Sequence, residues 1–152
     1  MEQLPKEFIK DIFLGQYENI IIKCGHAYLG YALIAIGIEF LGKCMDTKLP
    51  SWHPESSQHF DLALKEIPSL KKYSGLNLRD LLRNGMAHSL APKPGIDLSE
   101  RKHGTTHLGL DSIGLPTLNV EDFYEDFKEA CKHVINQVFL PSDKMNRGFI
   151  KH

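Results

Sequence analysis

The chain has 152 residues, of which 42% are hydrophobic and 24% are charged, and its formal net charge is −1. These values are typical of one soluble domain and exclude a bulk nucleic-acid binder, which would be strongly basic. The start lacks the regions of a signal peptide, and the longest apolar stretch, 27–38, is shorter than the ~20 residues of a membrane span. We therefore expect a cytoplasmic protein without membrane association, with Cys24, Cys44 and Cys131 as reduced thiols in the core.

The first part of the chain predicts two helices. Pro5 suits the first turn of the first one, and apolar residues then repeat at helical spacing until Gly15 interrupts the pattern. The second helix, 27–44, is apolar on nearly every side and contains three glycines that would let other helices approach closely. We expect it at the centre of a helical bundle or in a subunit interface.

Glu39 is the one acidic residue of that apolar helix. A carboxylate removed from water needs a partner, and Arg79 and Arg83 are the two candidates. The pair would either orient an arginine in a functional site or act as a structural ion pair.

The middle of the chain predicts two further helices. The third helix ends or bends at Pro68. The fourth is expected over 78–89, with Asn77 as its N-cap and Asp80 in the capping-box position. Gly85 falls on the apolar face of this fourth helix, which predicts close contact with a neighbouring helix.

Residues 91–119 contain too many prolines and glycines for a long helix. Weak alternation at 107–110 and 115–120 predicts a short β-hairpin, or else an irregular insertion, before the last helix. The last helix is capped by Asn119, carries a clear apolar stripe from Phe123 to Val138 and ends at Pro141.

Together these elements predict an all-α fold, a helical bundle with a short irregular or β-hairpin insertion before its last helix. A single domain is expected over 1–141, followed by a polar C-terminal tail over 142–152.

Six residues, Arg83-Asn84-Gly85-Met86-Ala87-His88, lie near the end of the fourth helix. On an ideal α-helix Arg83 and His88 are about 140° apart, so a bent arginine side chain and a relaxed last turn are needed to bring them together. Segment 65–103, which surrounds these residues, carries eight Lys or Arg and four Asp or Glu. This excess of positive charge favours phosphate binding. The alternative is that it reflects only the ordinary variation of surface charge along a chain.

An arginine, a polar residue and a histidine at this spacing, at the end of a helix, resemble the R-x(4–6)-H signature of HEPN domains. HEPN domains are small all-α domains, and many are metal-independent endoribonucleases of toxin or defence type. The helical pattern resembles the family over most of the chain. The resemblance implies a HEPN-like bundle in which two motifs meet across a homodimer, with helix 27–44 as the candidate interface.

The residue types of the motif fit RNA cleavage by attack of the 2′-hydroxyl without a metal. His88, with an ordinary pKa near ~6.5, would act as general base or acid. Arg83 would stabilise charge on the phosphate, and Asn84 would orient the imidazole or donate to phosphate. The other charged residues assigned to the site are two substrate-binding cations and two supporting carboxylates, namely Arg79, Lys93, Glu39 and Asp80.

No metal or cofactor is expected, because the chain has no C-x2-C, H-E-x-x-H, Walker A or G-x-G-x-x-G string. The expected partners are RNA or a nucleotide phosphate, a second copy of the chain and a cognate inhibitor protein. Trp52 and Tyr73 are candidates for stacking on bases. The alternative is a non-catalytic module that binds nucleotide, RNA or protein, in which Arg83, Asn84 and His88 only stabilise the end of a helix.

Overall fold

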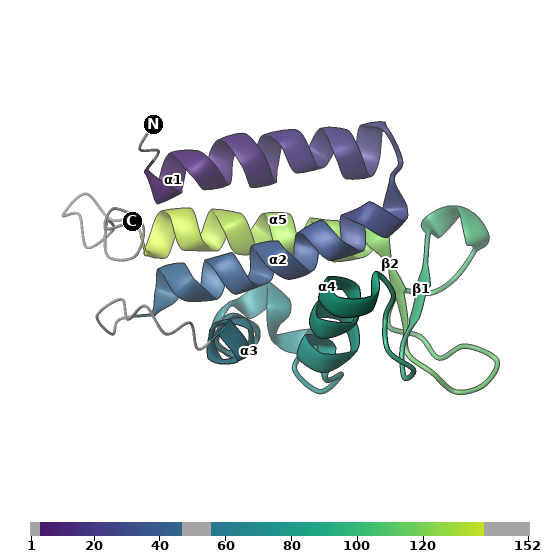
Figure 1. The fold of residues 1–152 in the computed structure, drawn as a ribbon. Helices are drawn as coiled ribbons and strands as arrows, with labels where there is room; N and C mark the ends of the chain where they lie inside the picture. The colour runs from purple at the N-terminus through teal and green to yellow at the C-terminus, as the bar shows by residue number, and fades with distance from the viewer. Residues whose placement is uncertain (1–3, 47–55, 139–152) are drawn as a thin grey trace.

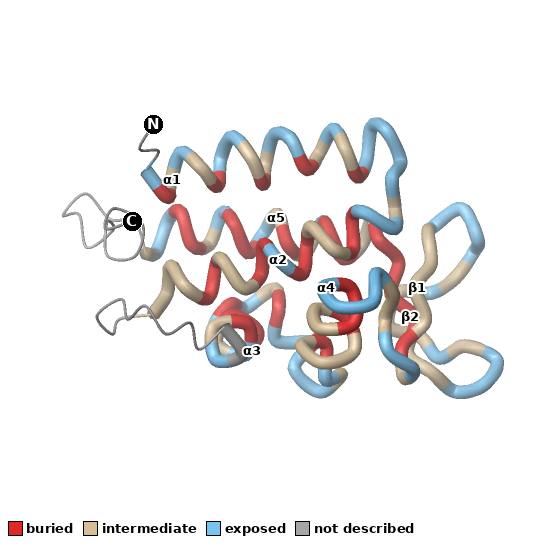
Figure 2. The backbone as a smooth tube through the Cα atoms, in the orientation of Figure 1, coloured by how far each residue is buried: buried red, intermediate tan, exposed pale blue. Residues whose placement is uncertain are grey.

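The computed structural model describes residues 4–46 and 56–138. It is 69% helix and 6% strand, which confirms the mainly-α class. The helices pack into a bundle with a small sheet at one end (Figure 1). One hydrophobic core extends from Ile9 to Ile135, and its residues face the interior of the bundle (Figure 2). The three cysteines are free thiols, although Cys24 is exposed rather than in the core.

The N-terminal helical rod consists of α1 (Pro5–Phe8), η1 (Ile9–Gln16) and η2 (Glu18–Lys23). Gly15 lies inside η1, so the predicted interruption is wrong. On an α-helix, side chains four positions apart differ by about 40° in direction around the axis. The helices η1 and η2 are π-helical, and their i→i+5 hydrogen bonds widen the turn. A wider turn fits the spacing of the buried residues of the rod, which recur every four positions: Pro5, Ile9, Phe13, Tyr17 and Ile21.

The apolar helix α2 (Ala27–Met45) lies at the centre of the bundle, and α3 (Ser56–Glu66) packs closely against it (Figure 1). A Cβ at Gly42 would lie 1.7 Å from the carbonyl oxygen of His59, so only glycine permits this approach. The predicted close packing at the glycines of this helix is confirmed. By length and composition α2 could also cross a membrane, with a mean hydropathy of 1.4, but the core helix of a soluble protein passes the same test.

The chain after α3 turns into the 3-10 helix η3 (Pro68–Tyr73), as the proline predicted. Tyr73 is fully buried, and its hydroxyl lies 2.5 Å from Oδ2 of Asp126. The predicted base stacking by Tyr73 is therefore wrong, because no face of its ring is open to a nucleotide. Trp52, the other stacking candidate, lies outside the described residues.

The predicted fourth helix is present as η4 (Arg79–Asn84) followed by α4 (Gly85–Ser89). We call the two together the motif helix. Its predicted capping box is wrong. An N-cap residue needs an extended backbone, whereas Asn77 has a φ of 54°, and Asp80 instead forms an ion pair with Lys93.

A small parallel sheet forms between β1 (Asp97–Ser99) and β2 (Thr117–Asn119), with the short helix η5 (Arg101–His103) after β1. The predicted hairpin is reduced to one antiparallel bridge, between Leu110 and Pro116. The parallel pairing was not predicted, because three-residue strands show too little alternation to be recognised.

The last helix, α5 (Val120–Gln137), begins after Asn119, as predicted. The Asn119 side chain does not cap the first turn but bonds to Thr105 and Asp122, which ties the insertion to the helix. The predicted end of the helix at Pro141 and the tail lie outside the described residues. The predicted apolar stripe is confirmed by the burial of Phe123, Phe127, Ala130, Cys131 and Val134.

Candidate functional site

The motif helix packs against α2 and is joined to it by two contacts. Arg83 reaches Glu39 in the second half of α2. Leu90, directly after the motif helix, accepts a hydrogen bond from the hydroxyl of Tyr28 in the first turn of α2. These two contacts hold the segment that carries Arg83 and His88 against a central element of the core.

Gly85 allows the chain to fold back directly after the motif helix. A Cβ at Gly85 would lie 2.5 Å from the carbonyl oxygen of Ala91 and 2.9 Å from the backbone nitrogen of Lys93. Lys93 also donates its backbone N–H to the carbonyl oxygen of Leu81 at 2.8 Å. Gly85 is buried, as predicted, but the predicted neighbouring helix is wrong, since the returning chain fills that space.

Glu39 pairs with Arg83 and not with Arg79. Nε of Arg83 lies 2.9 Å from Oε2 of Glu39, and Nη2 lies 3.4 Å from Oε1. The side chains are 27% and 17% exposed, so the pair is partly shielded from water. Two donors on one carboxylate fix the plane of the guanidinium as well as its position.

The outer edge of the Arg83 guanidinium keeps donors for a ligand. Of its five N–H groups, Glu39 takes the Nε donor and one on Nη2, and Oδ1 of Asn84 lies 3.4 Å from Nη1. One N–H therefore remains on each terminal nitrogen and can bind a phosphate oxygen.

His88 is exposed in the last turn of the motif helix. No hydrogen bond or ion pair joins its imidazole to another residue within 4–46 and 56–138. Asn84 bonds to Arg83 and to Asp80 rather than to His88. Arg83 lies in the π-helical part of the motif helix, which ends at Asn84, and His88 lies in the α-helical part that follows.

The two predicted substrate-binding cations are each paired with a carboxylate. Arg79 lies 3.2 Å from Asp61, and Lys93 lies 2.7 Å from Asp80. The hydrogen bond from Lys93 lowers the pKa of Asp80. Because Glu39 and Asp61 come from outside 65–103, they offset part of the positive charge that the sequence segment alone indicated.

One side of α2 presents apolar residues to solvent. Leu29 is 49% exposed and Ile36 is 57% exposed, and both face the same way as partly exposed Ala32 and Leu33. We call these four residues the α2 stripe. Glu39 lies three residues beyond Ile36, so the stripe borders the Arg83–Glu39 pair.

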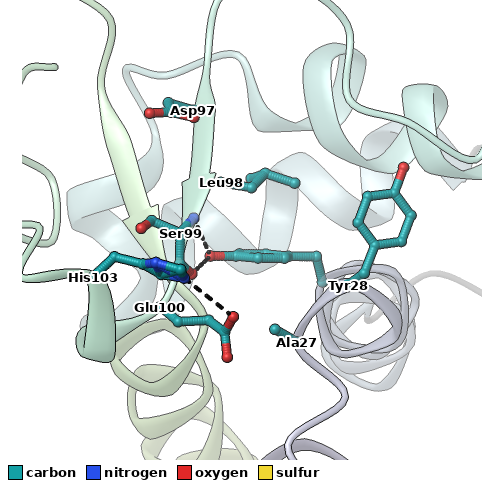
Figure 3. Close-up of a pocket in the computed structure, with 8 residues that line it drawn as sticks. Ala27, Tyr28, Asp97, Leu98, Ser99, Glu100 and His103 are labelled. Carbon is teal, nitrogen blue, oxygen red and sulfur yellow. Dashed lines mark hydrogen bonds and ion pairs between the residues drawn. The ribbon is translucent and has the colours of Figure 1, made fainter. Parts of the chain in front are cut away.

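A pocket of about 450 Å³ lies between the first turns of α2 and the segment of β1 and η5 (Figure 3). Tyr28 forms one side of it, and Glu100 and His103 lie on the other. The buried Tyr31 ring reaches across to β1, where its hydroxyl lies 2.6 Å from the carbonyl oxygen of Ser99. Sequence reasoning missed this pocket because its walls lie about seventy positions apart and neither carries a motif.

A partly buried polar network joins η3, the insertion and α5. The Tyr73 hydroxyl lies 2.7 Å from Nε2 of His107, and the backbone N–H of Asn119 donates to Nδ1 at 3.0 Å. The imidazole therefore carries its proton on Nε2 and donates it to Tyr73, which donates in turn to Asp126. Burial lowers the pKa of His107, whose neutral form suits this network.

Comparison with family models, with curated proteins and with solved structures finds no match to this chain. Among the described residues, no group of three or more His, Cys, Asp or Glu side chains could hold a metal ion.

Proposed function

We propose that the protein is a HEPN-like endoribonuclease that cleaves RNA without a metal ion through Arg83 and His88. One observation carries the proposal. Glu39 anchors a guanidinium whose outer edge keeps two donors, and an imidazole follows it on the exposed end of the same helix.

The proposed reaction is a transfer within the RNA chain. The imidazole of His88 takes the proton of a ribose 2′-hydroxyl, and the 2′-oxygen forms a bond to the adjacent phosphorus. The bond from phosphorus to the 5′-oxygen of the next nucleotide breaks, and that oxygen takes a proton. Arg83 stabilises the charge that develops on the phosphate oxygens. The products end in a 2′,3′-cyclic phosphate and a 5′-hydroxyl.

The reaction needs one group that takes a proton and another that gives one, on opposite sides of the phosphorus. One chain supplies a single His88, whereas two chains supply two. We therefore propose a homodimer in which the α2 stripes of two copies pack together, since solvent-exposed Leu29 and Ile36 are better buried in an interface. We propose that this dimer acts in the cytoplasm and that a cognate protein inhibits its nuclease activity.

Cleavage of single-stranded RNA in EDTA tests the proposal. Wild-type protein is expected to cut, and His88→Ala to lower the rate at least about 100-fold, because general acid–base catalysis contributes 10²–10⁴-fold. His133→Ala, on α5, is the matched control and should retain the wild-type rate. Equal rates for wild type and His88→Ala would contradict the role of His88.

The alternative, a non-catalytic module that binds a nucleotide or RNA, is favoured by a different observation. Glu39 already offsets the charge of Arg83, and a structural ion pair would look the same. This alternative predicts that wild type and His88→Ala bind RNA equally and that neither cuts it.

A further inference from the structure

We propose that the pocket between α2 and the segment of β1 and η5 holds a guanine base of the RNA substrate. This inference rests on the proposed ribonuclease function and adds a base preference to it. The position of the pocket, its aromatic wall and the carboxylate of Glu100 support it.

The position of the pocket suits a base next to the reacting phosphate. Tyr28 lines the pocket and also donates its hydroxyl to the carbonyl oxygen of Leu90. Leu90 lies two residues beyond His88, so Tyr28 belongs both to the pocket wall and to the end of the motif helix. RNA held at Arg83 and His88 would pass directly by the pocket mouth.

The size and walls of the pocket suit an aromatic ligand. Its volume of about 450 Å³ lies in the range of small-molecule sites. Tyr28 is 54% exposed and offers a ring face on which a base stacks. Leu98, from β1, adds an apolar side chain to the lining (Figure 3).

Glu100 supplies the selective group. Its Oε2 forms ion pairs with Nζ of Lys102 and Nε2 of His103, each at 3.6 Å, which is beyond hydrogen-bond distance. Within the described residues no hydrogen bond reaches Oε1 or Oε2, so both oxygens can accept hydrogen bonds from a ligand in the pocket.

Guanine is the base that matches such a carboxylate. Its N1–H and its N2 amino group are adjacent donors on one edge, and two parallel donors fit the two oxygens of a carboxylate. Adenine and cytosine place a ring acceptor beside their amino group, and uracil places a single N–H between two carbonyls. Each of these bases would set a lone pair against the Glu100 carboxylate.

A binding experiment tests the pocket without catalysis. The four ribonucleoside 3′-monophosphates are titrated into full-length protein, and the amide resonances of Leu98, Ser99 and Glu100 are followed by NMR. Guanosine monophosphate is expected to bind at least tenfold tighter than the other three. Glu100→Gln should abolish this preference, because its amide sets a donor against a donor of guanine. Glu129→Gln, on the surface of α5, should keep it.

A cleavage map separates this inference from the proposed function. Wild type is expected to cut next to guanosine in an RNA of mixed sequence, and Glu100→Gln to cut without base preference. Cleavage by wild type without base preference would overturn the guanine pocket and leave the ribonuclease intact. Tight guanosine binding that Glu100→Gln abolishes, with no cleavage at all, would support the pocket and overturn the ribonuclease. Equal binding of all four nucleotides would overturn the pocket in either case.

Discussion

Arg83 and Glu39 are separated by 44 positions in the sequence, yet they form the best-shielded arginine–carboxylate pair next to the motif. The sequence pointed to both residues, because a lone carboxylate in an apolar helix needs a cation. It left Arg79 and Arg83 as equal candidates. The structure selects Arg83, since Arg79 turns to Asp61 at the exposed surface.

A double-mutant cycle measures this pair. Glu39→Ala, Arg83→Ala and the combined variant are expected to give a coupling energy of about 1 kcal/mol in urea unfolding, because shielding from water strengthens the attraction. The same cycle on Asp61 and Arg79, which are 56% and 38% exposed, should give less than about 0.5 kcal/mol. Equal coupling in the two cycles would show that burial adds nothing to the Glu39–Arg83 contact.

His107 predicts a pH dependence of stability. Burial lowers the pKa of His107 in the folded protein below its usual 6.5, so between these two values the unfolded chain binds a proton that the folded chain does not. Stability contributed by His107 is therefore complete above about pH 6.5 and decreases as the pH falls, by at most about 1.4 kcal/mol per pH unit.

Urea unfolding at pH 7 and pH 5 checks this dependence. His107→Gln should reduce the difference in unfolding free energy between the two pH values. The pKa values of Asp80 and Asp122 are lowered, so these residues lose their contributions to stability only in more acidic solution. They therefore contribute little to the change in stability between pH 7 and pH 5. The same pH dependence in wild type and His107→Gln would contradict the assignment.

The turn that follows the motif helix requires a glycine at position 85. Gly85→Ala is expected to destabilise the protein by about 2 kcal/mol, because its Cβ would meet backbone atoms of Ala91 and Lys93, which cannot rotate away. Gly15→Ala is the matched control. Its Cβ has no neighbour closer than 3.5 Å, and alanine favours a helix, so it should be neutral or stabilising. Thermal unfolding that ranks the two variants the other way would contradict the packing at Gly85.

The helices could be predicted from the sequence, but the small sheet could not. The motif helix and α5 have long apolar repeats, and periodicity marks such elements well. The strands β1 and β2 have three residues each, and their pairing depends on contacts between distant segments. The candidate site shows the same dependence on distant contacts. Arg83 and His88 share one sequence motif and could be predicted, whereas Tyr28 and Glu100 line one pocket only after the chain has folded.

The exposed α2 stripe predicts that the protein associates with a second copy of itself. Sedimentation velocity is expected to show a dimer for wild type and a monomer for Ile36→Glu, because a charge in the centre of the proposed interface would be buried without a partner. Ile113→Glu is the control, since Ile113 is also exposed but lies in the insertion. A wild-type monomer, or an Ile36→Glu dimer, would contradict the proposed interface.

The chemical ends of the cleaved RNA report directly on the proposed reaction. Mass spectrometry of a short RNA incubated with the protein in EDTA is predicted to show a 2′,3′-cyclic phosphate on the upstream product and a 5′-hydroxyl on the downstream one. Both products should form at least about 100-fold more slowly with His88→Ala or Arg83→Ala. Intact RNA, ends of any other kind, or the same products from His88→Ala at the wild-type rate would contradict a nuclease built on Arg83 and His88.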